Sequence, residues 1–370
     1  MSKNIVLLSD STGNSSSKLF KTNVWWMFQT LDLIDASKQI AYYDNGVGTS
    51  SFKLFAILGG VFGFGLKRNI IDIYSFCCRN YVEGDRIYGF GFSSGAFTIR
   101  VVALLIAREG LVPYSGDEIA LARYANSAYR DFRRHFLAKG QFTSLRNLRD
   151  HIIRAYHRLC GFALYKKGNQ IEVPSIHFLG LWDTVDAYGG PIQEITDAID
   201  YWYWPLSMPD RFMNSKIHRA CHALALEDER EAFRPVIWDE RYVRSMDDNK
   251  LYDINAGWKV SEELQGRLKP IDNKRLSQVW FVGVHSDIGV GYPQNGLSYV
   301  TLDWMLDRAE PFGLLLDPLQ HQLMRSMVDC YDKLNESRHG LSLQATQSSR
   351  DLQRAALQAV VSARSRIYAG

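Results

Sequence analysis

Several features that would assign this chain to a specialised class are scarce or absent. Its longest apolar stretch, residues 54–66, has 13 residues and includes four glycines, whereas a membrane-spanning helix needs about 20 apolar residues. The apolar run at residues 5–8 is shorter than the ~7–15 residues of a signal-peptide core, and no cleavage site follows it. The sequence therefore predicts a soluble, cytoplasmic protein, which only a dedicated secretion system would export.

Charge of one sign is also scarce. The 43 Lys and Arg residues stand against 40 Asp and Glu, which leaves a formal net charge of +3, and no block of five or six basic residues occurs. Nucleic-acid binding depends on clustered Lys and Arg that face the phosphates. We therefore expect no nucleic-acid partner.

Cysteines are few and carry no metal pattern. There are five, an odd number, and they form no pair of CxxC motifs, so we expect a reducing compartment rather than a disulfide framework. His218 and His222 have the i, i+4 spacing of helical metal ligands, but the H-E-x-x-H glutamate is missing. We expect these two histidines to be packing or surface groups, and we expect no metal and no other cofactor.

Aromatic residues, in contrast, are abundant: 9 Trp, 19 Tyr and 19 Phe. No internal repeat and no Pro/Gly-rich linker divides the chain, so we expect one elaborated domain over residues 1–340. Insertions are expected at about 110–170 and at 191–250, the second forming a cap, and residues 341–370 read as a polar helical tail. The aromatic excess either fills a large core or lines an apolar binding surface.

Short apolar runs typical of buried strands alternate with segments of helical periodicity. The expected strands are 4–8, 39–43, 86–92, 175–181 and 279–284. The expected helices are 23–33, 69–81, 96–107, 118–136, 145–158, 217–233, 299–308 and 319–334, with a loop rich in Gly and Phe at 59–65. This alternation predicts a mostly parallel sheet with helices on both faces.

The clearest chemical motif is Gly91-Phe92-Ser93-Ser94-Gly95, which lies between an expected strand and an expected helix. It matches the G-x-S-x-G turn that presents the nucleophilic serine of α/β-hydrolases. The glycines allow a tight turn, and the helix N-terminus favours developing negative charge. We predict that Ser93 is a nucleophile; a phosphate-binding glycine loop is the weaker alternative, because no second strand ends in the acidic residue that a dinucleotide site needs.

The acid and base of such a site follow the nucleophile in the order Asp or Glu, then His. Asp183 is the first carboxylate after the strand at 175–181, and Asp186 is the alternative acid. His285 directly follows the last expected strand and precedes a loop of small residues. We predict Asp183 as the acid and His285 as the base, with a helix cap or loop anchor as the other role open to Asp183.

Two backbone amides stabilise the oxyanion in this fold: that of the residue after the nucleophile and one from a loop after an earlier strand. These criteria predict the amides of Ser94 and Ser11. Asp10 lies beside Ser11, where it would contact substrate, cap the following helix or brace the loop.

Several segments together resemble a known family, the α/β-hydrolase domains that include the catalytic domains of type VI secretion phospholipase effectors. The matching segments are 9–12, 22–24, 42–49, 84–85, 91–100, 178–189, 223–230 and 280–292. The resemblance implies a hydrolase of lipid esters with Ser93, Asp183 and His285 as its triad. It also marks two departures, because this family usually has Arg at the position of Ser94 and often has Gly at that of Ser11.

We therefore predict an α/β-hydrolase-type serine esterase that forms an acyl-enzyme from lipid or phospholipid esters. The aromatic run at 201–204, with Trp202 and Trp204, would bind substrate, line an acyl channel or make a peripheral membrane contact; a plain packed insertion is the alternative. Hydrolysis of soluble esters, thioesters or amides, and a catalytically weak interaction module that retains the fold, are the alternative functions.

Overall fold

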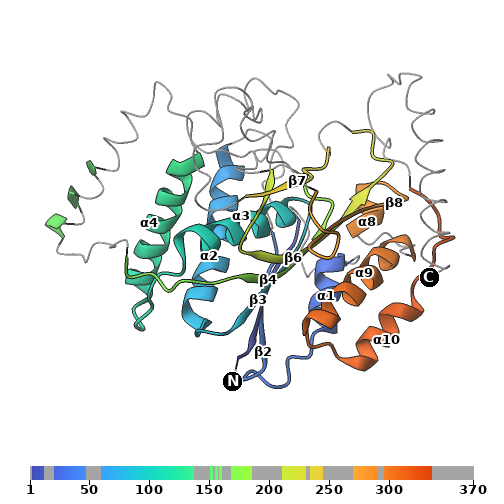
Figure 1. The fold of residues 1–370 in the computed structure, drawn as a ribbon, viewed down its shortest axis with the longest axis horizontal. Helices are drawn as coiled ribbons and strands as arrows, with labels where there is room; N and C mark the ends of the chain where they lie inside the picture. Colours follow the sequence, from blue (N-terminus) through green and yellow to red (C-terminus); the bar gives the residue numbers. More distant parts are fainter. Residues whose placement is uncertain are drawn as a thin grey trace.

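The structure is a computed structural model and describes residues 2–11, 21–46, 60–136, 151–152, 155–156, 158–160, 168–185, 211–230, 234–244, 270–289 and 296–335. Strands alternate with helices from β1 to α3, as predicted, and a further helix, α4, precedes β4 (Figure 1). The first half consists of β1 (Asn4–Ser9), α1 (Asn23–Thr30), β2 (Gln39–Asp44), α2 (Gly60–Asn80), β3 (Arg86–Phe92), α3 (Ser94–Glu109) and α4 (Glu118–Phe136). The second half consists of β4 (Ile176–Trp182), β5 (Phe212–Asn214), β6 (Ile217–Ala225), β7 (Asp239–Arg244), β8 (Leu276–Phe281), α8 (His285–Gly289), α9 (Gly296–Ala309), the 3-10 turn η4 (Glu310–Phe312) and α10 (Pro318–Ser326).

The main sheet has six strands in the order β2-β1-β3-β4-β6-β8, and every neighbouring pair is parallel. In register, Ser9 lies beside Gly91 and Phe92 lies beside Trp182. The carboxyl ends of the strands therefore meet at one edge of the sheet, which is where ligands bind in parallel α/β folds. A second, two-stranded sheet pairs β5 with β7.

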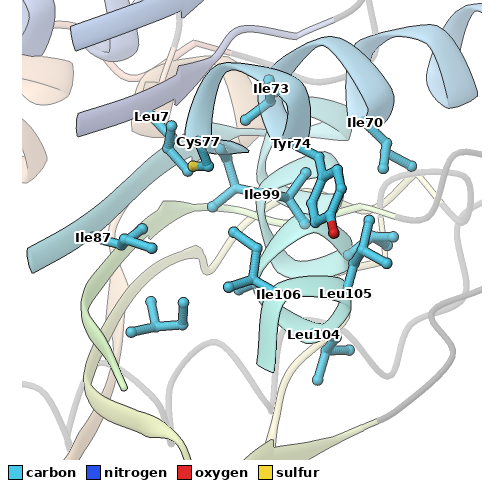
Figure 2. Close-up of a cluster of buried hydrophobic side chains, with 14 of the residues drawn as sticks. Leu7, Ile70, Ile73, Tyr74, Cys77, Ile87, Ile99, Leu104, Leu105 and Ile106 are labelled. Carbon is cyan, nitrogen blue, oxygen red and sulfur yellow. The ribbon is translucent and has the colours of Figure 1, made fainter. Parts of the chain in front are cut away.

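Helices cover both faces of the main sheet and form two apolar cores (Figure 1). Alternate residues of β1 serve the two faces, as the strand period of two requires: Ile5 and Leu7 belong to one core, and Val6 and Leu8 to the other. The first core includes side chains of α2, α3 and α4, among them Tyr74 (Figure 2). The second includes side chains of α1, α9 and α10. Because both faces are covered, the central strands read as continuous apolar runs.

The structure corrects three expectations about the elements. Residues 217–225, expected to start a helix, form strand β6 in the main sheet, and α2 begins at Gly60, inside the expected loop. The apolar segment of β6 is buried on both faces between β4 and β8, so its hydrophobic period could not distinguish a strand from a helix. Residues 217–225 of the expected cap thus belong to the sheet. Helix α10 ends at Ser326, well before the expected residue 334.

Among the helices that the structure describes, none combines the length and apolar character that a bilayer crossing requires. The tail at 341–370 lies outside the described residues, as do most of residues 137–167 of the insertion expected at about 110–170.

Candidate active site

Ser93 lies on the turn between β3 and α3 and has a backbone conformation that is rare for a residue with a side chain, with φ 58° and ψ −125°. The two glycines of the motif make this turn possible. A Cβ on Gly91 would lie 2.7 Å from the backbone of Ala96, and a Cβ on Gly95 would lie 2.5 Å from the carbonyl oxygen of Asp10. Strain of this kind concentrates at functional sites because the surrounding fold maintains it.

The structure brings the three side chains predicted for the triad into one chain of hydrogen bonds. His285 Nε2 lies 2.9 Å from Ser93 Oγ, and His285 Nδ1 lies 2.5 Å from Asp183 Oδ2. All three residues are buried, Asp183 completely. With the Nδ1 proton donated to Asp183, Nε2 is free of a proton and accepts the hydrogen bond of the Ser93 hydroxyl.

Asp183 follows β4 directly and is held by the sheet next to it. Like Ser93, Asp183 has a positive φ, 38°. Its backbone amide donates to the carbonyl of Ala223 on β6. Its second oxygen, Oδ1, accepts the amide of Ala225 at 2.9 Å. One carboxylate oxygen thus accepts a hydrogen bond from the sheet and the other bonds the imidazole. Together the two bonds fix the orientation of the carboxylate.

Asp228 holds the loop that carries His285. Its Oδ2 accepts the backbone N–H of His285 at 3.0 Å, and the Arg230 guanidinium donates to both of its oxygens. Although burial favours the neutral acid, the hydrogen bonds from Arg230 and from His285 keep the pKa of Asp228 below its usual range. The ring of Phe92 stacks on His285 with 4.7 Å between centroids. The base is therefore fixed through its backbone, its ring face and both ring nitrogens.

Asp10 lies across β3 from Asp183, on the loop after β1. It is 2% exposed, and its Oδ1 accepts the amide of Ser11 at 2.7 Å. Its Oδ2 accepts the hydroxyls of Thr22 and Tyr43 at 2.7 and 2.6 Å. Burial raises the pKa of Asp10 to about 6, against the lowering effect of these hydrogen bonds.

Of the two residues predicted to supply oxyanion amides, Ser94 directly follows the nucleophile, and Ser11 lies on the loop after β1. Ser94 is the first residue of α3, so its amide belongs to the N-terminal turn of that helix. The amide of Ser11 donates to Asp10. This bond competes with the oxyanion role predicted for Ser11, which stays a prediction.

Three further predicted residues, Asp186, Trp202 and Trp204, lie outside the described residues. His222 is buried on β6, where its Nε2 accepts the amide of Thr184, and burial lowers its pKa to about 3. His218 is exposed on the same strand. One histidine of the pair is thus buried and the other exposed, and the two do not form a helical metal-binding pair.

Within the part of the chain that the structure describes, one grouping has the composition of a metal site: Asp303, Asp307 and His321 on α9 and α10. Arg325 already donates to both aspartates. The guanidinium neutralises the carboxylates that a cation would need, so we assign no metal to this grouping.

Asp228, Arg230, Thr22 and Tyr43 are the site residues to which sequence reasoning gave no role. All four fall within or beside the segments that carry the family resemblance, and Thr22 also stands where a helix N-cap is expected. Their partners lie on distant parts of the chain, and a single sequence offers no local signal for those pairings.

Comparison with curated proteins and solved structures finds distant relatives. The uncharacterized protein YEL023C of Saccharomyces cerevisiae is 31% identical over 201 residues, which cover 50% of this chain and 27% of that protein; the chain thus spans about a quarter of that relative. An uncharacterized protein from Pseudomonas aeruginosa has 16% identity and a TM-score of 0.47, with 88% of this chain and 48% of that chain covered. The esterase Est2 from Thermogutta terrifontis has 12% identity and a TM-score of 0.38, with coverage of 85% and 83%.

A comparison with protein families is decisive for classification. Residues 3–308 match the T6SS phospholipase effector Tle1-like catalytic domain, and this range includes Ser93, Asp183 and His285. The parallel six-stranded sheet with helices on both faces agrees with the predicted α/β-hydrolase-type fold. The chain belongs to the family of Tle1-like catalytic domains of type VI secretion phospholipase effectors.

Proposed function

We propose that this chain is a serine hydrolase that cleaves carboxylic esters of lipids, phospholipids in particular, through an acyl-enzyme on Ser93. One observation carries the proposal: the continuous chain of hydrogen bonds from Asp183 through His285 to Ser93 on the strained turn. A buried serine, imidazole and carboxylate in this order form the constellation that activates a hydroxyl for acyl transfer.

In the first step, Ser93 Oγ attacks the carbonyl carbon of the ester while His285 Nε2 takes the hydroxyl proton. The carbonyl electrons move to the oxygen, and the amide of Ser94 at the start of α3 stabilises the oxyanion. Asp183 stabilises the imidazolium that forms. When the intermediate collapses, the bond to the leaving alcohol breaks, and His285 returns the proton to that alcohol.

The second step runs the same proton path with water. His285 Nε2 takes a proton from water as the oxygen attacks the acyl carbon, and then gives the proton to Ser93 Oγ as the acyl bond breaks. The products are a carboxylic acid and the free enzyme. These side chains account for every proton transfer in the cycle.

Membership of a phospholipase effector family supports lipid esters as the substrate class. Phe92 stacks directly on the base but is buried in the core, so its role is to orient His285 rather than to line the acyl chain. Contact of Trp202 and Trp204 with the substrate or with a lipid surface remains part of this proposal.

The test is a substrate panel with the purified chain: p-nitrophenyl esters of increasing acyl length, a thioester, an amide, and vesicles of single phospholipids. Ser93→Ala is the test variant, and Ser326→Ala, an exposed serine on α10, is the matched control. We expect fatty-acid release from phospholipids by the wild type and by Ser326→Ala, and none by Ser93→Ala. Equal rates in the wild type and Ser93→Ala would remove Ser93 from the mechanism. Turnover of soluble esters or thioesters alone would contradict the lipid assignment, and no turnover of any substrate would favour a non-catalytic module.

A further inference from the structure

The backbone after β1 is clamped between two glycines. A Cβ on Gly95, in the first turn of α3, would meet the carbonyl oxygens of Ser9 and Asp10. A Cβ on Gly46, after β2, would lie 2.7 Å from the carbonyl oxygen of Asp10 and would also meet that of Ser11. The loop after β1 therefore packs directly against the first turn of α3, which follows the nucleophile, and no side chain lies between the two.

Asp10 ties this clamped loop to two further elements. Its Oδ1 accepts the amide of the next residue, Ser11, and so holds the loop from inside. Its Oδ2 accepts Thr22, the N-cap of α1, and Tyr43, near the end of β2. One carboxylate thus connects the ends of β1 and β2 and the start of α1 beside the nucleophile turn.

The donors to Asp10 are a backbone amide and two hydroxyls, all neutral. A carboxylate in a triad faces an imidazole whose charge it stabilises, as Asp183 does. Asp10 has no such partner among the described residues and cannot serve as a second acid for the base. What it supplies is a fixed set of acceptor positions for three donors.

Asp44 provides an internal comparison. It is the last residue of β2, and its Oδ2 accepts the Ser9 hydroxyl at 3.0 Å and the Asn69 side-chain amide at 2.7 Å. Burial raises its pKa to about 6, as it does for Asp10. The side chain of Asp44 also accepts the backbone amide of Gly46, and its backbone carbonyl accepts the amide of Asp10 at 2.9 Å. Asp44 is less buried than Asp10, and the two acids differ in that only the carboxylate of Asp10 bonds the Ser11 amide and the N-cap of α1 among the bonds given above.

We propose that Asp10 is a positioning residue that holds the loop after β1 against the first turn of α3, so that the Ser94 amide on the oxyanion side of Ser93 is in place before substrate binds. The inference rests on the proposed function. It predicts that loss of Asp10 slows acylation of Ser93 without weakening substrate binding, because misplacing the groups that face the reacting atom acts on the transition state.

The experiment compares Asp10→Ala, Asp10→Asn, Tyr43→Phe and Asp44→Ala with the wild type. Titration with a fluorophosphonate counts the reactive sites, and kcat and KM on p-nitrophenyl butyrate are then expressed per titrated site. Asp10→Ala should lower kcat per site about 10- to 100-fold with an unchanged KM. Tyr43→Phe, which removes one donor, should lower it about threefold to tenfold.

The conservative and control variants sharpen the result. Asparagine keeps a carbonyl oxygen for Ser11 and an amide for the two hydroxyls, so Asp10→Asn should stay within about threefold of the wild type. Asp44→Ala should lower the melting temperature, because it removes the bonds to Ser9 and Asn69. It should leave kcat per titrated site within about twofold, because the three bonds of the Asp10 carboxylate and the bond from the Asp10 amide to the carbonyl of residue 44 all stay.

Two results would overturn the inference. In one, Asp10→Ala reduces the number of titrated sites while each remaining site keeps wild-type kcat, which is a purely structural effect. In the other, Asp44→Ala lowers kcat per site as much as the Asp10 variants do. If Asp10→Ala does not fold, an unchanged kcat in Tyr43→Phe would contradict the inference equally. Failure of the proposed function would look different, since the wild type itself would show no titratable site.

Discussion

Two aspartates occupy matching places on either side of the strand that ends at Ser93. Asp10 follows β1 and Asp183 follows β4, the two neighbours of β3, and both carboxylates are buried. Each accepts a backbone amide with Oδ1: that of Ser11 for Asp10 and that of Ala225 for Asp183. Their second oxygens differ, because Oδ2 of Asp183 meets an imidazole whereas Oδ2 of Asp10 meets two hydroxyls.

This difference indicates two distinct roles for carboxylates at the same edge of the sheet. An imidazole can gain a proton during the reaction, so the carboxylate beside it responds to a charge that comes and goes. Hydroxyls keep their protons throughout, so the carboxylate beside them can only fix positions. The roles of these two aspartates therefore do not follow from their places beside β3. They follow from the group that bonds Oδ2 of each carboxylate.

The largest effect should come from the imidazole side. Asp183→Asn removes the acceptor that directs the Nδ1 proton, so His285 loses the tautomer that can accept from Ser93. We expect kcat to fall by about 10³–10⁴ with the fold retained, as in other serine hydrolases with this change. Steady-state kinetics and circular dichroism measure both. A loss below about tenfold would place Asp183 and Asp10 in the same class and break the comparison.

A smaller effect is expected from the anchor of the base. Asp228→Asn keeps an oxygen for the His285 amide but replaces the charged fork to Arg230 with a weaker pairing. We expect kcat to fall about tenfold, since His285 keeps both ring contacts but its loop is less firmly held. The matched variant is Arg230→Lys, which keeps the charge and loses the fork. A fall as deep as that of Asp183→Asn would mean that Asp228 acts on the proton transfer itself.

The sequence predicts those features of the two aspartates that depend on neighbouring residues in the chain, and not those that depend on distant ones. Ser93, Asp183 and His285 each follow a short apolar run, and the parallel sheet brings such strand ends together. The contacts that fix the base and the loop join residues far apart in the chain, such as Asp228 to His285 and Asp10 to Tyr43. The sequence predicts a helix in place of β6 for a related reason, because the pairing of this strand with β4 and β8 decides its conformation.

The last prediction concerns how the free energy of unfolding depends on pH, where the expected effect on turnover is the smallest. The pKa values of Asp10 and Asp44 are raised to about 6 by burial, from an ordinary 3.8, so the folded chain holds these protons more tightly than the unfolded chain. Each acid adds stability that is complete below about pH 4 and is lost as pH rises through about 6. His222 has the opposite sign: its pKa is lowered to about 3, so the stability it contributes is present above about pH 6.5 and is lost as pH falls.

Urea unfolding of the wild type and of Asp10→Asn at several pH values between 4 and 8 tests this. Asn cannot titrate, so the variant should gain about 1–3 kcal/mol relative to the wild type at pH 8 compared with pH 4. An identical pH dependence in the two proteins would show that Asp10 is not a desolvated acid.

The central claim is that Ser93 is a nucleophile activated by His285, and covalent labelling tests it most directly. The purified chain is treated with a fluorophosphonate, digested, and the adduct is located by mass spectrometry, with His285→Ala treated in parallel. The account predicts one adduct per chain, on Ser93, and little labelling of His285→Ala. No adduct on the wild type, an adduct on another residue such as Ser94, or equal labelling of His285→Ala would contradict it.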